Sequence, residues 1–115
     1  MTERDADEMF QQLPWPFTDN RFPHGLGAVV QRTVLSGQSP ARLVIHDSDN
    51  NWLVGDGRTD PNQPNACVAT HIAHAVALNS SLKDLADLAP GWMAERPGPG
   101  QPWERSPHHY LPDQG

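Results

Sequence analysis

The chain of 115 residues has room for one domain with one modest hydrophobic core. Hydrophobic residues make up 37% of the chain and 12 residues are proline, so we expect a compact centre with irregular ends. The net charge of −6 disfavours nucleic acid as a partner, because binding to phosphate groups needs a basic surface, and it favours a basic protein partner.

Residues 1–24 form a leader rich in proline and aromatic residues. The first ten residues are charged and lack the apolar segment of a signal peptide, and no apolar run approaches the roughly 20 residues that span a bilayer. We therefore expect a cytoplasmic protein without a membrane partner. Trp15 and Phe17 are expected to pack the leader onto a single domain of residues 25–105, which a flexible tail of residues 106–115 follows.

Three strands are predicted in the first half of this domain. Residues 27–35 are rich in β-branched side chains, and residues 41–46 and 52–55 have the composition of two further strands. Residues 47–51, which are all Asp, Asn or Ser, separate the last two strands. Such residues favour turns, so the sequence predicts a hairpin here.

The second half adds two helices and two strands. Apolar residues recur at four-residue steps in residues 66–78, which predicts a helix with Asn65 as its N-cap. Ser81 is expected to begin a second, shorter helix. In residues 92–96, Trp92, Ala94 and Arg96 alternate with Met93 and Glu95, which predicts a strand with the two sets on opposite faces. Residues 103–105 suit an edge strand. The predicted fold is α+β, with an antiparallel sheet of four to five strands and two helices packed on one face.

The acidic turn also has oxygen ligands at alternate positions, as the start of a calcium-binding loop does. Counting from Asp47, however, Trp52 stands where such a loop needs glycine, and Arg58 stands where it needs a bidentate glutamate. The segment also lies between predicted strands, whereas the calcium motif lies between helices. We therefore predict a plain hairpin turn, in which Asp and Asn tolerate left-handed backbone.

A zinc site is a second hypothesis. Cys67, His71 and His74 are spaced at i, i+4 and i+7, so a helix would place them on one face. Thiolate and imidazole are zinc ligands, which makes these three residues the metal candidates. In the structural alternative, Cys67 is a small core residue and the histidines border the packed surface. Cys67 is the only cysteine, so no intrachain disulfide can form, as is usual in a reducing compartment, and no other cofactor is expected.

Catalysis has less support in the sequence. His46 and Asp47 are adjacent at the end of a predicted strand, so their side chains face opposite ways. The sequence has no glycine-flanked serine of the kind found at a nucleophile elbow, and no phosphate-binding glycine loop. We therefore do not expect an enzyme. The alternative is a small enzyme with His46, Asp47 and His71 in one pocket.

A protein-binding surface is the remaining hypothesis. Trp52, Trp92 and Trp103 lie in or beside predicted strands and are expected to pack in the sheet, although an exposed tryptophan would be an interface anchor. The segment 47–60 contains four acidic residues and one arginine. The residues predicted to contact a basic partner are Asp47, Asp49, Trp52 and Asp56.

Three segments of the chain, "VIHDSDNNWLVGDG", "SSLKDLADLAPGWMAER" and "PWER", resemble an uncharacterised family of small bacterial proteins. This family has a strand ending in His-Asp, a Ser-Leu-x-x-Leu-Ala-Asp-Leu-x-x-Gly-Trp-x-Ala-x-Arg block and a closing Pro-Trp-x-Arg. The positions that fit the last two motifs are Ser81, Leu82, Leu85, Ala86, Asp87, Leu88, Gly91, Trp92, Ala94, Arg96, Pro102, Trp103 and Arg105. The proline-rich leader departs from the family pattern.

The resemblance implies no activity, because the family has none assigned. The chain is also similar to immunity-protein domains of bacterial toxin systems, which are small α+β proteins that bind a toxin. We therefore expect a non-catalytic bacterial protein, of immunity or regulatory type, that binds another protein. A metal-binding protein that uses His71 and His74 is the alternative. Within the matched block, Arg96 and Arg105 are expected to pair with Asp87 or with the acidic turn. The oligomeric state is not predicted.

Overall fold

The computed structural model describes residues 15–17, 21–23, 25–58 and 63–108, and this part of the chain forms an α+β fold. Its sheet has six strands in the order β4-β1-β3-β2-β5-β6. The strands are β1 (Gly27–Gln31), β2 (Leu43–His46), β3 (Trp52–Gly55), β4 (Cys67–His71), β5 (Trp92–Glu95) and β6 (Glu104–Pro107). The helical segments are α2 (Arg32–Leu35), α3 (Ile72–Leu78) and the 3-10 helix η2 (Ser80–Leu85).

The predicted α+β class is confirmed, but the sheet is mixed and larger than expected. β1 pairs with β3 in parallel, whereas every other pairing is antiparallel. The cause is the position of the β2–β3 hairpin. β2 lies two strand positions away from β1, and β3 turns back into the position between them, which makes it parallel to β1.

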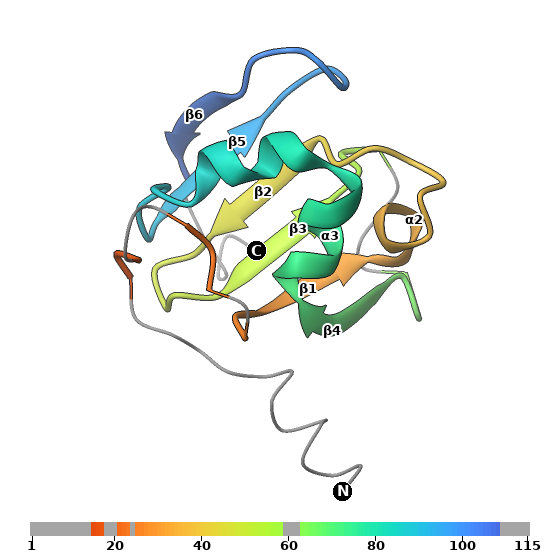
Figure 1. Ribbon diagram of the computed structural model, residues 1–115, viewed down its shortest axis with the longest axis horizontal. Helices are drawn as coiled ribbons and strands as arrows, with labels where there is room; N and C mark the ends of the chain where they lie inside the picture. Colours follow the sequence, from red (N-terminus) through yellow and green to blue (C-terminus); the bar gives the residue numbers. More distant parts are fainter. Residues whose placement is uncertain (1–14, 18–20, 24, 59–62, 109–115) are drawn as a thin grey trace, which may run out of the picture.

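Two helical segments cover one face of this sheet. Seen from that side, α3 lies in front of β1 and β3, and η2 lies in front of β2 (Figure 1). Apolar side chains from the sheet and from the helices fill the space between the two layers. This core includes Leu26, Val30, Val44, Trp52, Val54, Ile72, Leu82, Leu85 and Leu88. None of the helices in the described part of the chain is long and apolar enough to cross a bilayer.

Two predicted elements change type along their length, which corrects the sequence prediction. The predicted strand 27–35 ends at Gln31 and continues as α2. The predicted helix 66–78 is strand β4 as far as His71 and a helix only beyond it. β4 and β1 pair along five residues each, and this ladder of hydrogen bonds outweighs the weak helical pattern of the sequence. Asn65 is therefore not a helix cap, and its φ of 63° places it in a left-handed turn before β4.

The predicted turn at Asp47–Asn51 is confirmed, as is the hairpin of β2 and β3. The side chain of Asp47 shapes this turn, because its Oδ1 accepts hydrogen bonds from the backbone N–H groups of Asp49 and Asn51, both at 2.9 Å. Asn50 has a φ of 66°, the left-handed conformation that Asn adopts more readily than most residues.

The last two strands form as the sequence indicated. β5 occupies most of the predicted strand 92–96, and β6 is an edge strand that extends to Pro107, beyond the predicted domain boundary. The predicted second helix is present as the 3-10 helix η2. Its buried leucines, Leu82 and Leu85, face the core.

Candidate functional site

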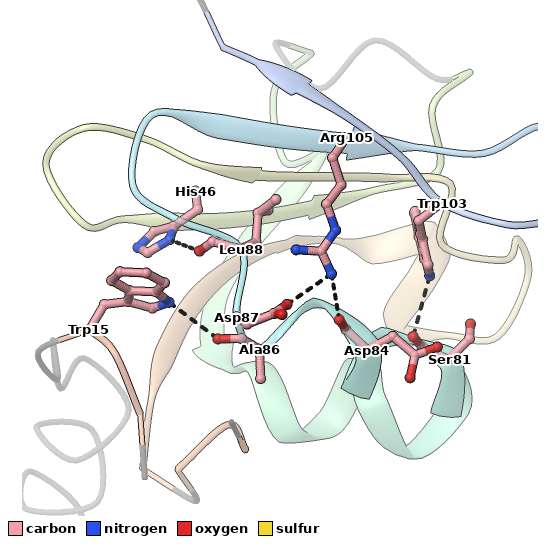
Figure 2. Close-up of polar contacts among 9 residues, drawn as sticks. All are labelled: Trp15, His46, Ser81, Asp84, Ala86, Asp87, Leu88, Trp103 and Arg105. Carbon is pink, nitrogen blue, oxygen red and sulfur yellow. Dashed lines mark hydrogen bonds and ion pairs between the residues drawn. The ribbon is translucent and has the colours of Figure 1, made fainter. Parts of the chain in front are cut away.

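His46, at the end of β2, is fully buried and holds three segments together. Its ring stacks on Trp52 of β3 with 3.8 Å between the ring centroids. Its Nδ1 donates to the carbonyl oxygen of Leu88 (2.6 Å), which can only accept, as drawn in Figure 2. Its Nε2 lies 2.6 Å from the side-chain amide oxygen of Asn50, in the turn. His46 is therefore a fixed support beneath the acidic turn.

The acidic turn starts directly after His46, and its two carboxylates have different surroundings. Besides the two backbone contacts of Oδ1, Oδ2 of Asp47 accepts a hydrogen bond from Nδ2 of Asn51 (3.3 Å), so this half-buried carboxylate is engaged in the turn. Asp49 is exposed to solvent. Of the two residues, Asp49 therefore offers the more accessible side chain to a partner.

An exposed tryptophan lies at the same end of the sheet. Trp92 pairs with His46 of β2 on one side and with Pro107 of β6 on the other. Asp47 follows His46 and His108 follows Pro107, so Trp92 lies between the segments that contain Asp47 and His108. It is 40% exposed. Asp47, Ser48, Asp49 and His108 line a recess of about 480 Å³. We call this set, Asp47, Ser48, Asp49, Trp92 and His108, the acidic end of the sheet.

The backbone fixes the geometry of the acidic end. The N–H of Gly91 donates to the carbonyl oxygen of His46 (2.6 Å), and the N–H of His108 donates to the carbonyl oxygen of Gly91 (2.8 Å). Gly91 has a φ of 86°, which glycine adopts without steric cost. Backbone hydrogen bonds thus link the segment of His46 to that of Gly91, and the segment of Gly91 to that of His108.

The predicted partner-binding residues divide between this end and the interior. Trp52 is only 2% exposed and packs against Phe17, Phe22 and His46, so it belongs to the core. Asp56 is 1% exposed, and its carboxylate accepts hydrogen bonds from Oγ1 of Thr33 (2.7 Å) and the N–H of Arg58 (2.8 Å). Both residues therefore stabilise the fold from inside, and they are not accessible to a partner at the protein surface.

Trp92 is expected from the sequence to pack in the sheet, but its indole is exposed in the structure. A weak signal existed, because Pro90 and Gly91 place Trp92 at the first position of its strand. A residue at a strand end has fewer neighbours to cover it than one at the centre.

The residues of the predicted zinc site are not on one helical face. Cys67 and His71 lie on β4, whereas His74 lies on α3. The rings of His71 and His74 stack with 5.7 Å between centroids. Within the described ranges, no three His, Cys, Asp or Glu side chains are grouped as metal ligands would be. Burial raises the pKa of the Cys67 thiol, an effect that Arg32 opposes and Asp56 reinforces, so the thiolate form that binds metal is disfavoured.

The pocket proposed for the alternative enzyme does not form around His46 and His71. His46 lies on β2 and His71 on β4, with β3 and β1 between them. Three strand spacings of about 4.8 Å separate the two backbones by about 14 Å. A proton-transfer pair needs hydrogen-bond distance, so the structure does not bring these histidines together for acid–base chemistry.

Side chains from several segments fasten η2 and the turn that follows it. They donate hydrogen bonds to backbone carbonyl oxygens of η2 and of this turn (Figure 2). The four contacts are Trp103 Nε1 to Ser81 O (3.3 Å), Arg105 Nη2 to Asp84 O (2.8 Å), Trp15 Nε1 to Ala86 O (3.2 Å) and His46 Nδ1 to Leu88 O (2.6 Å).

The two arginines of the block behave differently. Arg105 pairs with Asp87 at 2.8 Å, as the sequence predicted, but this ion pair is half-exposed and contributes little stability. Arg96 is 6% exposed and forms none of the predicted pairs with Asp87, Asp47 or Asp49.

Comparison of the chain with protein-family models, with curated proteins and with solved structures finds no match. The resemblance to an uncharacterised bacterial family and to immunity-protein domains therefore stays a prediction.

Proposed function

We propose that this chain is a non-catalytic protein that binds a basic segment of another protein at the acidic end of the sheet. The observation that supports this proposal is the position of Trp92, an exposed indole at the same end as the exposed carboxylate of Asp49. An aromatic face attracts a cation through its quadrupole, and a carboxylate binds it through charge-assisted hydrogen bonds. Lysine or arginine of a partner would satisfy both groups.

The acidic end is also rigid, which favours binding. His46 is buried beneath the turn and the backbone of Gly91 is bonded on both sides, so little conformational freedom is lost when a partner docks. Tryptophan is among the residue types that most often anchor protein interfaces. The recess beside the turn has room for one long side chain of the partner.

The described residues as a group carry no net charge. Seven of the 14 acidic residues and seven of the eight Lys and Arg residues fall in the described ranges, so these side chains balance one another. The net charge of −6 comes from the other residues. The acidic end therefore attracts a cation through its own carboxylates, and the rest of the described surface adds no excess negative charge.

Affinity capture with purified variants tests this proposal. Wild-type protein, Trp92→Ala and Asp49→Asn would each serve as bait, with the product of an adjacent gene as the first candidate prey. Because truncating an interface anchor costs about 2 kcal/mol or more, we expect Trp92→Ala to weaken binding about thirtyfold in calorimetry. Asp49→Asn should weaken it less, and added salt should reduce that difference.

Two matched controls separate the acidic end from the rest of the surface. Glu104→Gln removes an exposed carboxylate at the opposite end of the β5–β6 hairpin, and Leu78→Ala removes an exposed apolar side chain on α3. Both controls should bind as the wild type does. If Trp92→Ala and Asp49→Asn retain full affinity for a captured partner, the acidic end is not the binding surface.

A further inference from the structure

We propose that a second site, at the opposite end of β5, binds the carboxylate of a small organic acid between Arg96, Trp103 and the loop of residues 97–102. The site is separate from the acidic end, because Arg96 directly follows the last residue of β5 whereas Trp92 is its first. It involves a different charge and a different tryptophan, so it goes beyond the function proposed above.

Arg96 is the starting point, because its cation is buried and the described residues supply no counter-ion. Its Nε donates to the carbonyl oxygen of Ala41 (3.0 Å) and its Nη1 to Oγ of Ser81 (2.6 Å), both of which are neutral acceptors. The guanidinium carbon lies 4.2 Å from the centre of the Trp103 ring. Within the described ranges, no carboxylate lies within ion-pair distance of Arg96. A buried charge normally has such a partner.

A second arginine makes this region more positive. The N–H of Arg96 donates to the carbonyl oxygen of Arg42 (3.0 Å). Arg42 and Arg96 directly flank the paired residues Leu43 and Glu95, so the two arginines lie opposite each other on neighbouring strands. The Arg42 side chain donates only to the carbonyl oxygens of Asp56 and Pro97 among the described residues. Burial lowers the pKa of the Arg96 guanidinium, and the charge of Arg42 lowers it further. A bound anion would favour the charged form of Arg96 and so oppose both effects.

A pocket of about 500 Å³ gives a ligand access to Arg96. Leu85, Pro102 and Trp103 contribute apolar surface to its wall, and Gln101 is exposed at its margin. Arginine has five N–H donors, of which the two contacts above use two. The remaining donors on Nη1 and Nη2 form a fork that matches the two oxygens of one carboxylate.

The surroundings favour a carboxylate over a phosphate. Arg105 also lines the pocket, but its charge is already paired with Asp87. The exposed carboxylate of Asp84 lies in the wall as well and would repel a dianion. One guanidinium that has no carboxylate partner among the described residues lies beside an indole and apolar side chains. Such a site suits a monoanion with a compact apolar body, such as an aromatic or branched-chain acid.

Titration by NMR with three probes tests the proposal. Benzoate supplies the carboxylate and an apolar ring, benzamide supplies the same shape without charge, and inorganic phosphate supplies charge without the ring. We expect benzoate to shift the Trp103 indole N–H and the Arg96 Nε–H signals along a saturable curve, and the other two probes to leave them in place. Equal shifts with benzamide, stronger binding of phosphate, or no shift with benzoate would each overturn the proposal.

Two charge-matched variants keep the test independent of folding. Gln101→Glu places a negative charge at the margin of the pocket, whereas Gln38→Glu makes the same change on an exposed residue after α2. We expect Gln101→Glu to weaken benzoate binding about tenfold and Gln38→Glu to leave it unchanged. Equal binding by both variants would contradict a carboxylate site here. Arg96→Lys, which keeps the charge but loses the fork, should also bind about tenfold more weakly, after circular dichroism has shown that it folds.

Discussion

The two ends of strand β5 place charge and tryptophan together in opposite ways. At the acidic end, Trp92 is exposed and the nearby carboxylate of Asp49 faces solvent. At the other end, Trp103 is half-buried and covers Arg96, which is only 6% exposed. Solvent stabilises the first charge, whereas the protein must stabilise the second. The comparison shows that similar residue types suit a surface contact at one end and an enclosed contact at the other.

The ends also differ in what holds them in place. The acidic end rests on one buried ring, that of His46, which contacts a strand, a turn and the segment after η2. The Arg96 end rests on several side-chain contacts to η2, none of which is central to the core. We therefore expect single substitutions to affect stability more strongly beneath the acidic end.

The largest loss of stability is expected for His46→Ala. This change removes the stacking on Trp52 and leaves the carbonyl oxygen of Leu88 without its donor in a buried position. Together, the cavity and the lost hydrogen bond should lower the free energy of unfolding by about 3 kcal/mol. Urea denaturation measures this value. His74→Ala, on the exposed surface of α3, is the control and should change stability little.

A smaller loss is expected for Arg96→Ala, which removes the contacts to Ala41, Ser81 and Trp103 and should cost about 2 kcal/mol. Arg96→Met should cost only about 1 kcal/mol, because it keeps an apolar stem against Trp103 and removes the uncompensated charge. Urea denaturation of both variants distinguishes these effects. If methionine is as destabilising as alanine, the buried charge of Arg96 does not lower the stability of the fold.

At the acidic turn, Asp47→Ala should cost about 1.5 kcal/mol, because Oδ1 of Asp47 accepts two backbone N–H groups. Asp47→Asn keeps an acceptor oxygen in the same place and should cost less than about 0.5 kcal/mol. Thermal unfolding of the pair separates the structural use of this side chain from its charge. Equal losses in the two variants would mean that the charge itself holds the turn.

The smallest effect on stability is expected for Trp92→Ala. Its cross-strand contacts with His46 and Pro107 lie at the end of the sheet, and losing them should cost about 0.5 kcal/mol. The same variant is expected to have the largest effect on partner binding. A loss of several kcal/mol in urea denaturation would instead make Trp92 a structural residue and would leave the acidic end without its anchor.

Several features of this protein are readable from short stretches of sequence. The Asp47–Asn51 turn follows from residues that tolerate left-handed backbone between two apolar segments, and the hairpin follows from the turn. The strand that begins at Trp92 follows from alternation after Pro90 and Gly91. The pairing of Arg105 with Asp87 was predicted as one of several possible ion pairs. All these features depend mainly on interactions between near neighbours in the sequence or on a simple side-chain pattern.

Other features required the folded chain. Residues 67–71 have a helical pattern, yet they form β4 because β1 supplies the hydrogen-bond partners. The paired residues lie from 36 (Gln31 and Cys67) to 44 (Gly27 and His71) positions apart in the sequence. Burial of Trp52, exposure of Trp92 and enclosure of Arg96 likewise depend on which strands become neighbours. A local pattern extends over a few residues, whereas burial and charge compensation are set by side chains that meet only after distant segments have packed together.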